Sequence, residues 1–291
     1  MAYGLRGRNL RFPRFPHDID MDSFKRFLDR NHSPKTSKDI LYYAKIYGSC
    51  LLEQDFSKLN NFSISKKRHA LAALSNLAKF LGIHEDFKKL VKDYGLKWEN
   101  VKAEDLLISR LTKFETQGSV IAWTKKVKEE WPCFGAFMDF ITVSGLRCVE
   151  AIESCNLIID LSRQGKLNEY YNAEKEVLEH FRFKQIFIRN NKKAFVSIVP
   201  RTLIERVALS EKITLAQITN RIKRKGLNPR FNDIREYYAT CMTRHLSQPE
   251  IDFLQGRISG SVFMRNYFNP ALISDLKERV FKAIEELSLL S

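Results

Sequence analysis

Apolar residues recur at helical spacing along most of this chain, and this pattern limits the folds that it can adopt. The segment "SKKRHALAALSNLAKFLGI" (65–83) is typical, because its leucines and alanines fall on one face of a helix. Only "FKQIFIRNNKKAFVSIVP" (183–200) alternates as a strand does, with "RNNKKA" as the predicted turn of a β-hairpin. The sequence therefore predicts a mainly α fold with a small β-sheet.

Changes in composition divide the helical pattern into parts. Residues 1–16 carry four arginines and no acidic residue, which predicts a flexible basic arm. We expect a helical module over 17–97, a polar linker over 98–118 and a larger domain over 119–272. The last segment, 273–291, predicts a helix with one apolar face, which we interpret as a contact with a neighbouring protomer.

The balance of charge points to a polyanionic partner. The chain has 49 Lys and Arg against 34 Asp and Glu, a formal net charge of +15, and a pI of about 9.6. Such an excess favours nucleic acid first and an anionic membrane second. No apolar run approaches the ~18 residues of a membrane span, and the N-terminus does not resemble a signal peptide. We therefore expect no membrane partner and a cytoplasmic location.

Several common chemistries have no motif here. The five cysteines include no CxxC pair and the six histidines no HxxxH, so we expect neither a disulfide framework nor a bound metal. The phosphate-binding patterns GxxxxGK[ST] and GxGxxG and the GxSxG elbow are missing from the sequence. Chemistry on nucleic acid would then depend on Arg and Lys and on a covalent nucleophile, with no cofactor.

Three arginines lie among apolar residues or beside a glycine. They are Arg147 in "SGLRCVEA", Arg235 in "FNDIREYYAT" and Arg257 in "LQGRIS". Each one alone is more often a surface ion pair, but an isolated guanidinium among apolar neighbours is costly. A phosphate group would satisfy all three, because planar guanidinium groups bind its nonbridging oxygens with two hydrogen bonds each.

These segments resemble the motifs of tyrosine recombinases. "TVSGLRCVEA" (142–151) is similar to the first arginine box, T-G-L-R-x-x-E, and "NDIREYYAT" (232–240) to the second, H-x-L-R-H-x-x-A-T. "FLQGRISGSVFMRNYF" (253–268) is similar to the L-G-H…Y segment. The "GR" in that segment resembles archaeal virus and plasmid integrases, which are mobile-element proteins.

The resemblance implies a site-specific recombinase that cuts and rejoins DNA through a 3′-phosphotyrosyl intermediate, without metal or ATP. Tyr267 would be the nucleophile and Lys193, with Lys192 as rival, the general acid. Arg147, Arg235 and Arg257 would stabilise the transition state, and Glu150 would orient an arginine. Asn232 stands where the family has His or Lys, and Arg257 where it has His or Trp. Asn232 cannot transfer a proton at neutral pH.

The family's architecture and partners are also implied. The module at 17–97 would be a helical core-binding domain, and 119–272 an α+β catalytic domain. The partner would be double-stranded DNA at attachment sites, bound by a homo-tetramer that is a monomer or weak oligomer in solution. The residues that we expect to contact DNA are Lys66, Lys67, Arg68, Arg221, Lys223, Arg224, Lys225 and Arg265.

Two alternative functions remain open at this point. "TLAQITNRIKRKGLNP" (214–229) is also compatible with a helix-turn-helix that has a basic recognition helix, which would make the chain a non-catalytic DNA-binding regulator. A nicking and closing enzyme similar to type IB topoisomerases would share the tyrosine chemistry, but would not exchange strands between sites.

Overall fold

A computed structural model describes residues 19–98, 102–117, 119–189, 192–257, 262–266 and 268–290 of the 291-residue chain. These residues are mainly helical with a small amount of sheet, which confirms the predicted mainly α fold with a small β-sheet. The two-domain tyrosine recombinase architecture stays a prediction. Contacts between Cα atoms divide the chain into two compact units, Met1–Leu111 and Thr112–Ser291. Each unit is described by itself below.

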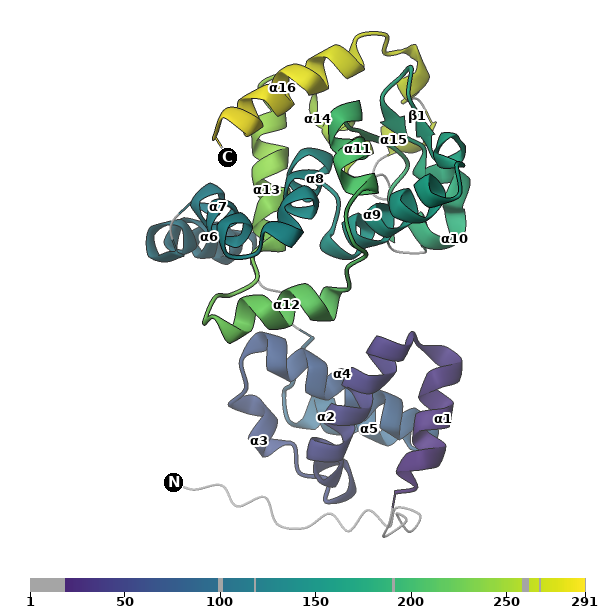
Figure 1. The fold of residues 1–291 in the computed structure, drawn as a ribbon. Helices are drawn as coiled ribbons and strands as arrows, with labels where there is room; N and C mark the ends of the chain where they lie inside the picture. Colours follow the sequence, from purple (N-terminus) through teal and green to yellow (C-terminus); the bar gives the residue numbers. More distant parts are fainter. Residues whose placement is uncertain are drawn as a thin grey trace. The chain divides into compact units, whose positions relative to one another are not determined.

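All the secondary-structure elements in the described residues of the first unit are helices (Figure 1). Its helices are α1 (Met21–Asn31), α2 (Pro34–Leu52), α3 (Ser57–Asn60), α4 (Ile64–Phe80) and α5 (His84–Asp93), and α6 (Ala103–Gln117) begins in it. The predicted linker at 98–118 thus contains a helix.

Side-chain caps begin the main helices of this unit, and apolar faces hold them together. Asp20 accepts hydrogen bonds from the backbone of α1, and Ser33 and Ser63 do the same for α2 and α4. The α2 and α4 helices pack closely together, burying Ala44 of α2 and Leu74 of α4 completely. The apolar residues that recur at helical spacing in the sequence form the helix faces that this core buries.

The second unit contains the remaining elements. In chain order they are α7 (Val120–Glu130), η1 (Pro132–Phe134), α8 (Gly135–Ser144), α9 (Cys148–Arg163), η2 (Leu167–Glu169), β1 (Tyr171–Asn172), β2 (Val177–Leu178), η3 (His180–Phe183), α10 (Lys184–Phe187), β3 (Ile188–Arg189), β4 (Lys192–Lys193), β5 (Ser197–Ile198), α11 (Arg201–Ala208), α12 (Leu215–Arg224), α13 (Phe231–Met242), α14 (Gln248–Leu254), α15 (Val262–Asn266), η4 (Pro270–Leu272) and α16 (Leu276–Leu290).

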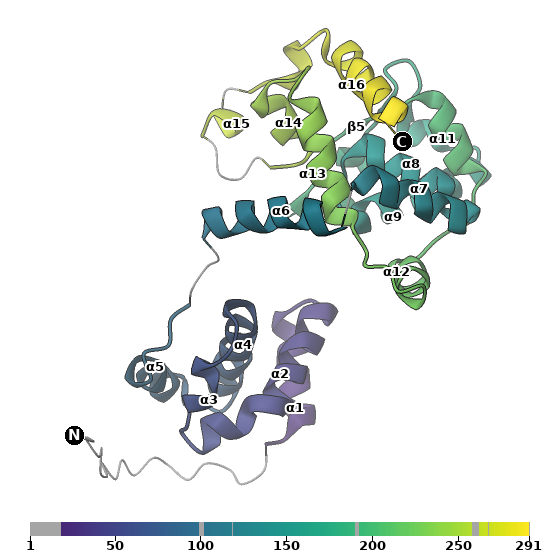
Figure 2. The same ribbon diagram turned by 90° about the vertical axis from the view of Figure 1, so that its left-hand side faces the viewer.

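The centre of this unit is α8, which is buried along most of its length. It packs against α9, α11 and α13, and residues such as Met138, Phe140 and Ile141 have no exposed surface. Figure 2 shows α14 beside α13. The helices α9, which follows Arg147, and α13, which carries Arg235, are therefore packed against one buried helix.

The strands form two small antiparallel sheets, and the predicted hairpin over 181–200 is only partly correct. One sheet has the order β1-β2-β5, with Leu178 opposite Ser197. The other pairs β3 with β4, with Ile188 opposite Lys193. The lysines thus begin a strand and are not turn residues, and 180–187 is helical because Phe183 and Phe187, four residues apart, both contact the Tyr170 ring.

The last helix, α16, folds back onto its own unit. Its apolar face, including Val280, Ala283 and Leu287, is buried against α8 and α13 (Figure 1). The chain itself therefore covers the apolar face that the sequence analysis assigned to a protomer contact. A contact with another protomer stays a prediction.

No single helix in the described ranges is long and apolar enough to cross a membrane. One bent pair, Pro132–Ser144 with Cys148–Arg163, reaches the required length and composition at an angle of 119°. Both of its helices belong to the core of the second unit.

Candidate functional site

The turn between α8 and α9 positions Arg147. Gly145 ends α8 with a positive φ of 59°, and a Cβ there would lie 2.4 Å from the ring of Tyr238 in α13. Only glycine fits this close approach. Arg147 then caps α9, and its backbone N–H donates to Glu150 Oε2 at 3.2 Å. The glycine of the first arginine box is therefore a packing requirement between α8 and α13.

The carboxylate of Glu150 binds two guanidinium groups. Its exposed fraction is 1 %, and it accepts from Arg147 Nη1 at 3.0 and 3.2 Å and from Arg189 Nη2 at 3.4 Å. A buried carboxylate is stable only when it is paired in this way. Glu150 thus fixes the orientation of Arg147 and ties β3 to α9.

Arg235 lies in the interior and is held by backbone carbonyls. Its exposed fraction is 7 %, with Nη1 donating to the carbonyl of Gly145 at 2.6 Å and Nη2 to that of Gln255 at 2.5 Å. Gln255 Nε2 donates in return to the Arg235 carbonyl at 3.1 Å. Burial, followed by the like charges of Arg147 and Arg257, lowers the pKa of Arg235 to about 10. It is therefore still a cation at neutral pH.

The segment after α14 brings Arg257 next to the lysine strand. Gly256 has a positive φ of 65°, and a Cβ there would lie 1.7 Å from the carbonyl oxygen of Lys193. The backbone N–H of Arg257 donates to the carbonyl of Asp252 at 2.7 Å, while its guanidinium lies 4.0 Å from the Asp252 carboxylate. Contrary to the expectation of an apolar setting, the Arg257 side chain is 45 % exposed.

The predicted charge cluster exists and carries an excess of positive charge. Arg147, Arg235 and Arg257 interact electrostatically, since both of the others lower the pKa of Arg235. The acidic side chains that pair with this group in the described residues are Glu150, which also binds Arg189, and Asp252, whose carboxylate lies 4.0 Å from Arg257. Four guanidinium groups thus face two carboxylates. An anion such as a phosphate is the partner that such an arrangement favours.

The remaining residues of the predicted catalytic set are placed less completely. Tyr267 lies outside the described residues, as does the side chain of Arg265. Lys192 is exposed and Lys193 is half-buried on β4, where the approach of Gly256 joins this strand to the Arg257 segment. Asn232 is exposed in the first turn of α13, the helix that also carries Arg235.

Apart from Arg265 on α15, the residues predicted to contact DNA lie at two places, one in each unit. Lys66, Lys67 and Arg68 are in the first turns of α4, where the Lys66 ammonium lies 4.2 Å from the centre of the Phe62 ring. The second group lies at the end of α12, an amphipathic helix at one edge of its unit (Figures 1 and 2). There Arg221 lies over the Phe134 ring and Lys225 pairs with Glu130.

Sequence reasoning missed Arg189 and Gln255. Arg189 stands in the alternating segment, where it was counted only as part of a turn, and nothing in its neighbours indicates a contact with Glu150. Gln255 precedes the glycine of the third motif, and its role comes mainly from its backbone carbonyl. A carbonyl is present at every residue, so no side-chain pattern could have identified this contact.

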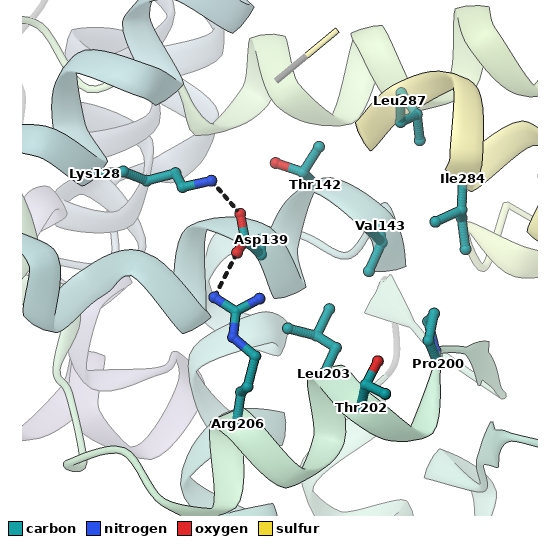
Figure 3. Close-up of a pocket in the computed structure, with 10 residues that line it drawn as sticks. All are labelled: Lys128, Asp139, Thr142, Val143, Pro200, Thr202, Leu203, Arg206, Ile284 and Leu287. Atoms are coloured by element: carbon teal, nitrogen blue, oxygen red, sulfur yellow. Dashed lines mark hydrogen bonds and ion pairs between the residues drawn. The ribbon is translucent and has the colours of Figure 1, made fainter. Parts of the chain in front are cut away.

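Two cavities of about 280 Å³ lie in the second unit. One lies beside the cluster and is lined by Glu150, Glu153 and Arg189 among others. The other lies among α7, α8, α11 and α16, where Asp139 accepts from Lys128 at 2.7 Å and from Arg206 at 2.8 Å (Figure 3). Because these charges are already paired and no predicted site residue lines it, this second cavity is separate from the arginine cluster.

The described part of the chain holds no group of three or more His, Cys, Asp or Glu side chains arranged to bind a metal. Its five cysteines are free thiols.

Comparison with known proteins finds a similarity for less than half of the chain. Residues 159–282 match the family model described as archaeal phage integrase. The predicted resemblance is thereby confirmed. The matched range contains Lys193, Arg235, Arg257 and Tyr267, whereas Arg147 precedes it. The match supports a role as an integrase or DNA recombinase, with DNA as the partner. No curated protein and no solved structure matches the chain.

Proposed function

We propose that this protein is a tyrosine-type site-specific recombinase that cuts and rejoins double-stranded DNA. The observation that carries the proposal is the cluster of Arg147, Arg235 and Arg257, which comes from three separate motifs and has more positive than negative charge. The burial of Arg235 against two carbonyls argues against an ordinary surface ion pair. The match to archaeal phage integrases supports the same chemistry.

In the first step, the hydroxyl oxygen of Tyr267 loses its proton to solvent, attacks a backbone phosphorus and forms a 3′-phosphotyrosyl bond. The bond between phosphorus and the 5′ oxygen breaks, and Lys193, with Lys192 as the rival, gives a proton to the leaving 5′ oxygen. The three arginines donate hydrogen bonds to the nonbridging oxygens as charge develops on them. In the second step the oxygen of a 5′ hydroxyl attacks the phosphorus of the phosphotyrosyl bond and returns its proton to the lysine. The bond between phosphorus and the Tyr267 oxygen breaks, and this oxygen takes a proton from solvent.

Arg257 and Asn232 depart from the family pattern, and both departures are compatible with a lysine as the general acid. Arg257 replaces a His or Trp with a permanent cation, which adds charge stabilisation and no acid or base. Asn232 is neutral and can donate a hydrogen bond from the start of α13. Both substitutions leave the proton transfer to the lysine strand.

The wider assembly follows from the same proposal. The helical unit that contains Lys66, Lys67 and Arg68 would bind the duplex as a core-binding domain, and α12 would add contacts from the second unit. Tyrosine chemistry at two sites would require a tetramer on DNA. The protein would act inside the host cell, where its DNA substrate is.

A nicked suicide substrate containing the element's own attachment site tests the proposal. We expect a covalent protein–DNA adduct with the wild type, undiminished by EDTA, and none with Tyr267→Phe. An adduct that persists in this variant would refute the role of Tyr267, and no adduct on any site would refute the recombinase.

The identity of the acid is tested on a substrate with a 5′-bridging phosphorothiolate, whose leaving group needs no proton. Lys193→Ala and Lys192→Ala are compared on this DNA and on ordinary DNA. Only the variant that lacks the acid should be slow on ordinary DNA and restored by the phosphorothiolate. A product analysis with two sites separates strand exchange from the nicking and closing of a topoisomerase.

A further inference from the structure

Four phenylalanines form a row between the lysine strand and the segment of the proposed nucleophile. The Phe195 and Phe253 rings are stacked, with centroids 6.0 Å apart and planes at 10°. Phe253 contacts Phe268 at 5.7 Å, and Phe268 contacts Phe263 of α15 at 6.1 Å. All three contacts lie in the range in which aromatic pairs attract each other. We call these residues the phenylalanine row.

The two ends of the row adjoin different parts of the proposed chemistry. Phe195 follows Lys193 by two residues and is half-buried, like Phe253 in α14. Phe268 follows Tyr267 directly in the sequence, and its backbone N–H donates to the carbonyl of Phe263 at 2.9 Å. The row therefore ends one residue away, in the sequence, from the proposed nucleophile.

The backbone reinforces this connection at the middle of the row. Gly256, three residues after Phe253, packs against the Lys193 carbonyl so closely that no Cβ could be added. The Gln255 carbonyl between them holds Arg235. The segment from Phe253 to Gly256 therefore contacts both the lysine strand and the arginine cluster. Phe253 also contacts Phe268, which follows the proposed nucleophile in the sequence.

We propose that the phenylalanine row positions the nucleophile and the general acid relative to each other, so that both are aligned on one phosphate. The inference rests on the tyrosine mechanism proposed above and adds positioning residues to it: Phe195 for the lysine, Phe268 for the tyrosine, and Phe253 for both. None of these residues touches the reacting atoms. Their effect comes through alignment, where an error of ~1 Å can cost ~100-fold in rate.

The experiment compares Phe195→Ala, Phe253→Ala and Phe268→Ala on two suicide substrates, one ordinary and one with the 5′-bridging phosphorothiolate. All three variants should form adduct ~10- to 100-fold more slowly than wild type on ordinary DNA. The phosphorothiolate should restore Phe195→Ala to nearly the wild-type rate, because only acid alignment is lost. Phe268→Ala and Phe253→Ala should stay slow. A matched control is Phe281→Ala, a half-buried phenylalanine on α16.

Two results would overturn the inference: variants that are no slower than Phe281→Ala, or a Phe195→Ala variant equally slow on both substrates. Hydrogen exchange of the free protein provides a measurement that needs no activity. Phe253→Ala should raise exchange in both 192–198 and 262–268, and a rise confined to one of them would refute the coupling. If the wild type itself forms no adduct, the proposed function fails, and the exchange result still decides whether the row couples the two segments.

Discussion

The contact between Gly256 and the Lys193 carbonyl gives the sharpest prediction about how the site is assembled. In Gly256→Ala the new Cβ would lie 1.7 Å from this oxygen, whereas ordinary contacts begin near 3.4 Å. The loop and the lysine strand must therefore separate by about 1.7 Å, the difference between these two distances. The obstacle is a backbone atom, so no side-chain rotation can relieve it.

Gly256→Ala should affect both stability and the rate of adduct formation, for two separate reasons. Alanine at a φ of 65° is strained by ~1–2 kcal/mol. In a unit of this size that strain corresponds to a fall in Tm of ~2–8 °C. The separation of the strand from the loop comes in addition, and a displacement of ~1 Å in a catalytic geometry can cost ~100-fold in rate. We expect Gly256→Ala to form DNA adducts at least ~100-fold more slowly.

A matched control isolates the second cost. Gly165 has a φ of 67° and nothing within 4 Å of an added Cβ, so Gly165→Ala carries the backbone strain alone. Thermal unfolding and adduct formation are measured for both variants. Gly165→Ala should lose stability and keep nearly full activity per folded molecule, and Gly256→Ala should lose more of both. Equal losses in the two variants would refute the role of the close approach.

Three further predictions concern charge. The hydrogen bonds from Arg279 lower the pKa of Glu250 from 4.5 to about 2. The stabilisation that this carboxylate provides is therefore complete above pH ~4.5 and is lost as the pH falls toward ~2. In urea unfolding, the free energy of unfolding of Glu250→Gln should fall less steeply with decreasing pH than that of the wild type. Arg235→Lys keeps a charge but loses the planar guanidinium that reaches both the Gly145 and Gln255 carbonyls, so the rate of adduct formation should fall by ~10²–10³. The control is Arg206→Lys, a change at an exposed arginine, which should leave this rate nearly unchanged. Alanine at each exposed cation near the end of α12 should reduce the salt dependence of DNA binding by ~1 in slope, and an unchanged slope would exclude phosphate contacts there. These cations are Arg221, Lys223 and Arg224.

Local periodicity was sufficient to predict most of the helices, although not α6, η3 and α10, and it did not predict the strands. In α8 and α9 the apolar spacing is the buried face itself, because a helix brings residues three and four apart together. The strands have only two residues each, too short for alternation to be distinct, and β5 pairs with β2 across the intervening β3 and β4. Such non-local pairing depends on tertiary contacts that no window of sequence contains.

The candidate site was predictable where it depends on side chains in motifs. Arg147, Arg235 and Arg257 were found in this way, and the structure brings them into electrostatic contact. The parts that were missed depend on backbone geometry, such as the two carbonyls that hold Arg235, or on a long-range contact such as that of Arg189 with Glu150. Neither has a spacing that could be recognised in the sequence.

The short helix α14 connects the C-terminal helix to this site. At its N-terminal end the buried carboxylate of Glu250 accepts from both terminal nitrogens of Arg279 in α16. Just beyond its other end, the Gln255 carbonyl holds Arg235. Removing α16 would therefore disturb the arginine cluster as well as expose the core. Any protomer contact made by this helix must use another face or displace it from its own unit.

The excess of guanidinium groups over carboxylates disfavours the free protein. Arg235 is buried with neutral carbonyl partners, and the like charges of Arg147 and Arg257 disfavour its charged form, as its lowered pKa reflects. A fold selected for stability alone would place an apolar side chain or a second carboxylate there. Under the proposed function, a DNA phosphate bound by the three arginines would offset this cost. The unfavourable charge of the free protein and the affinity for that phosphate would then be two aspects of the same feature.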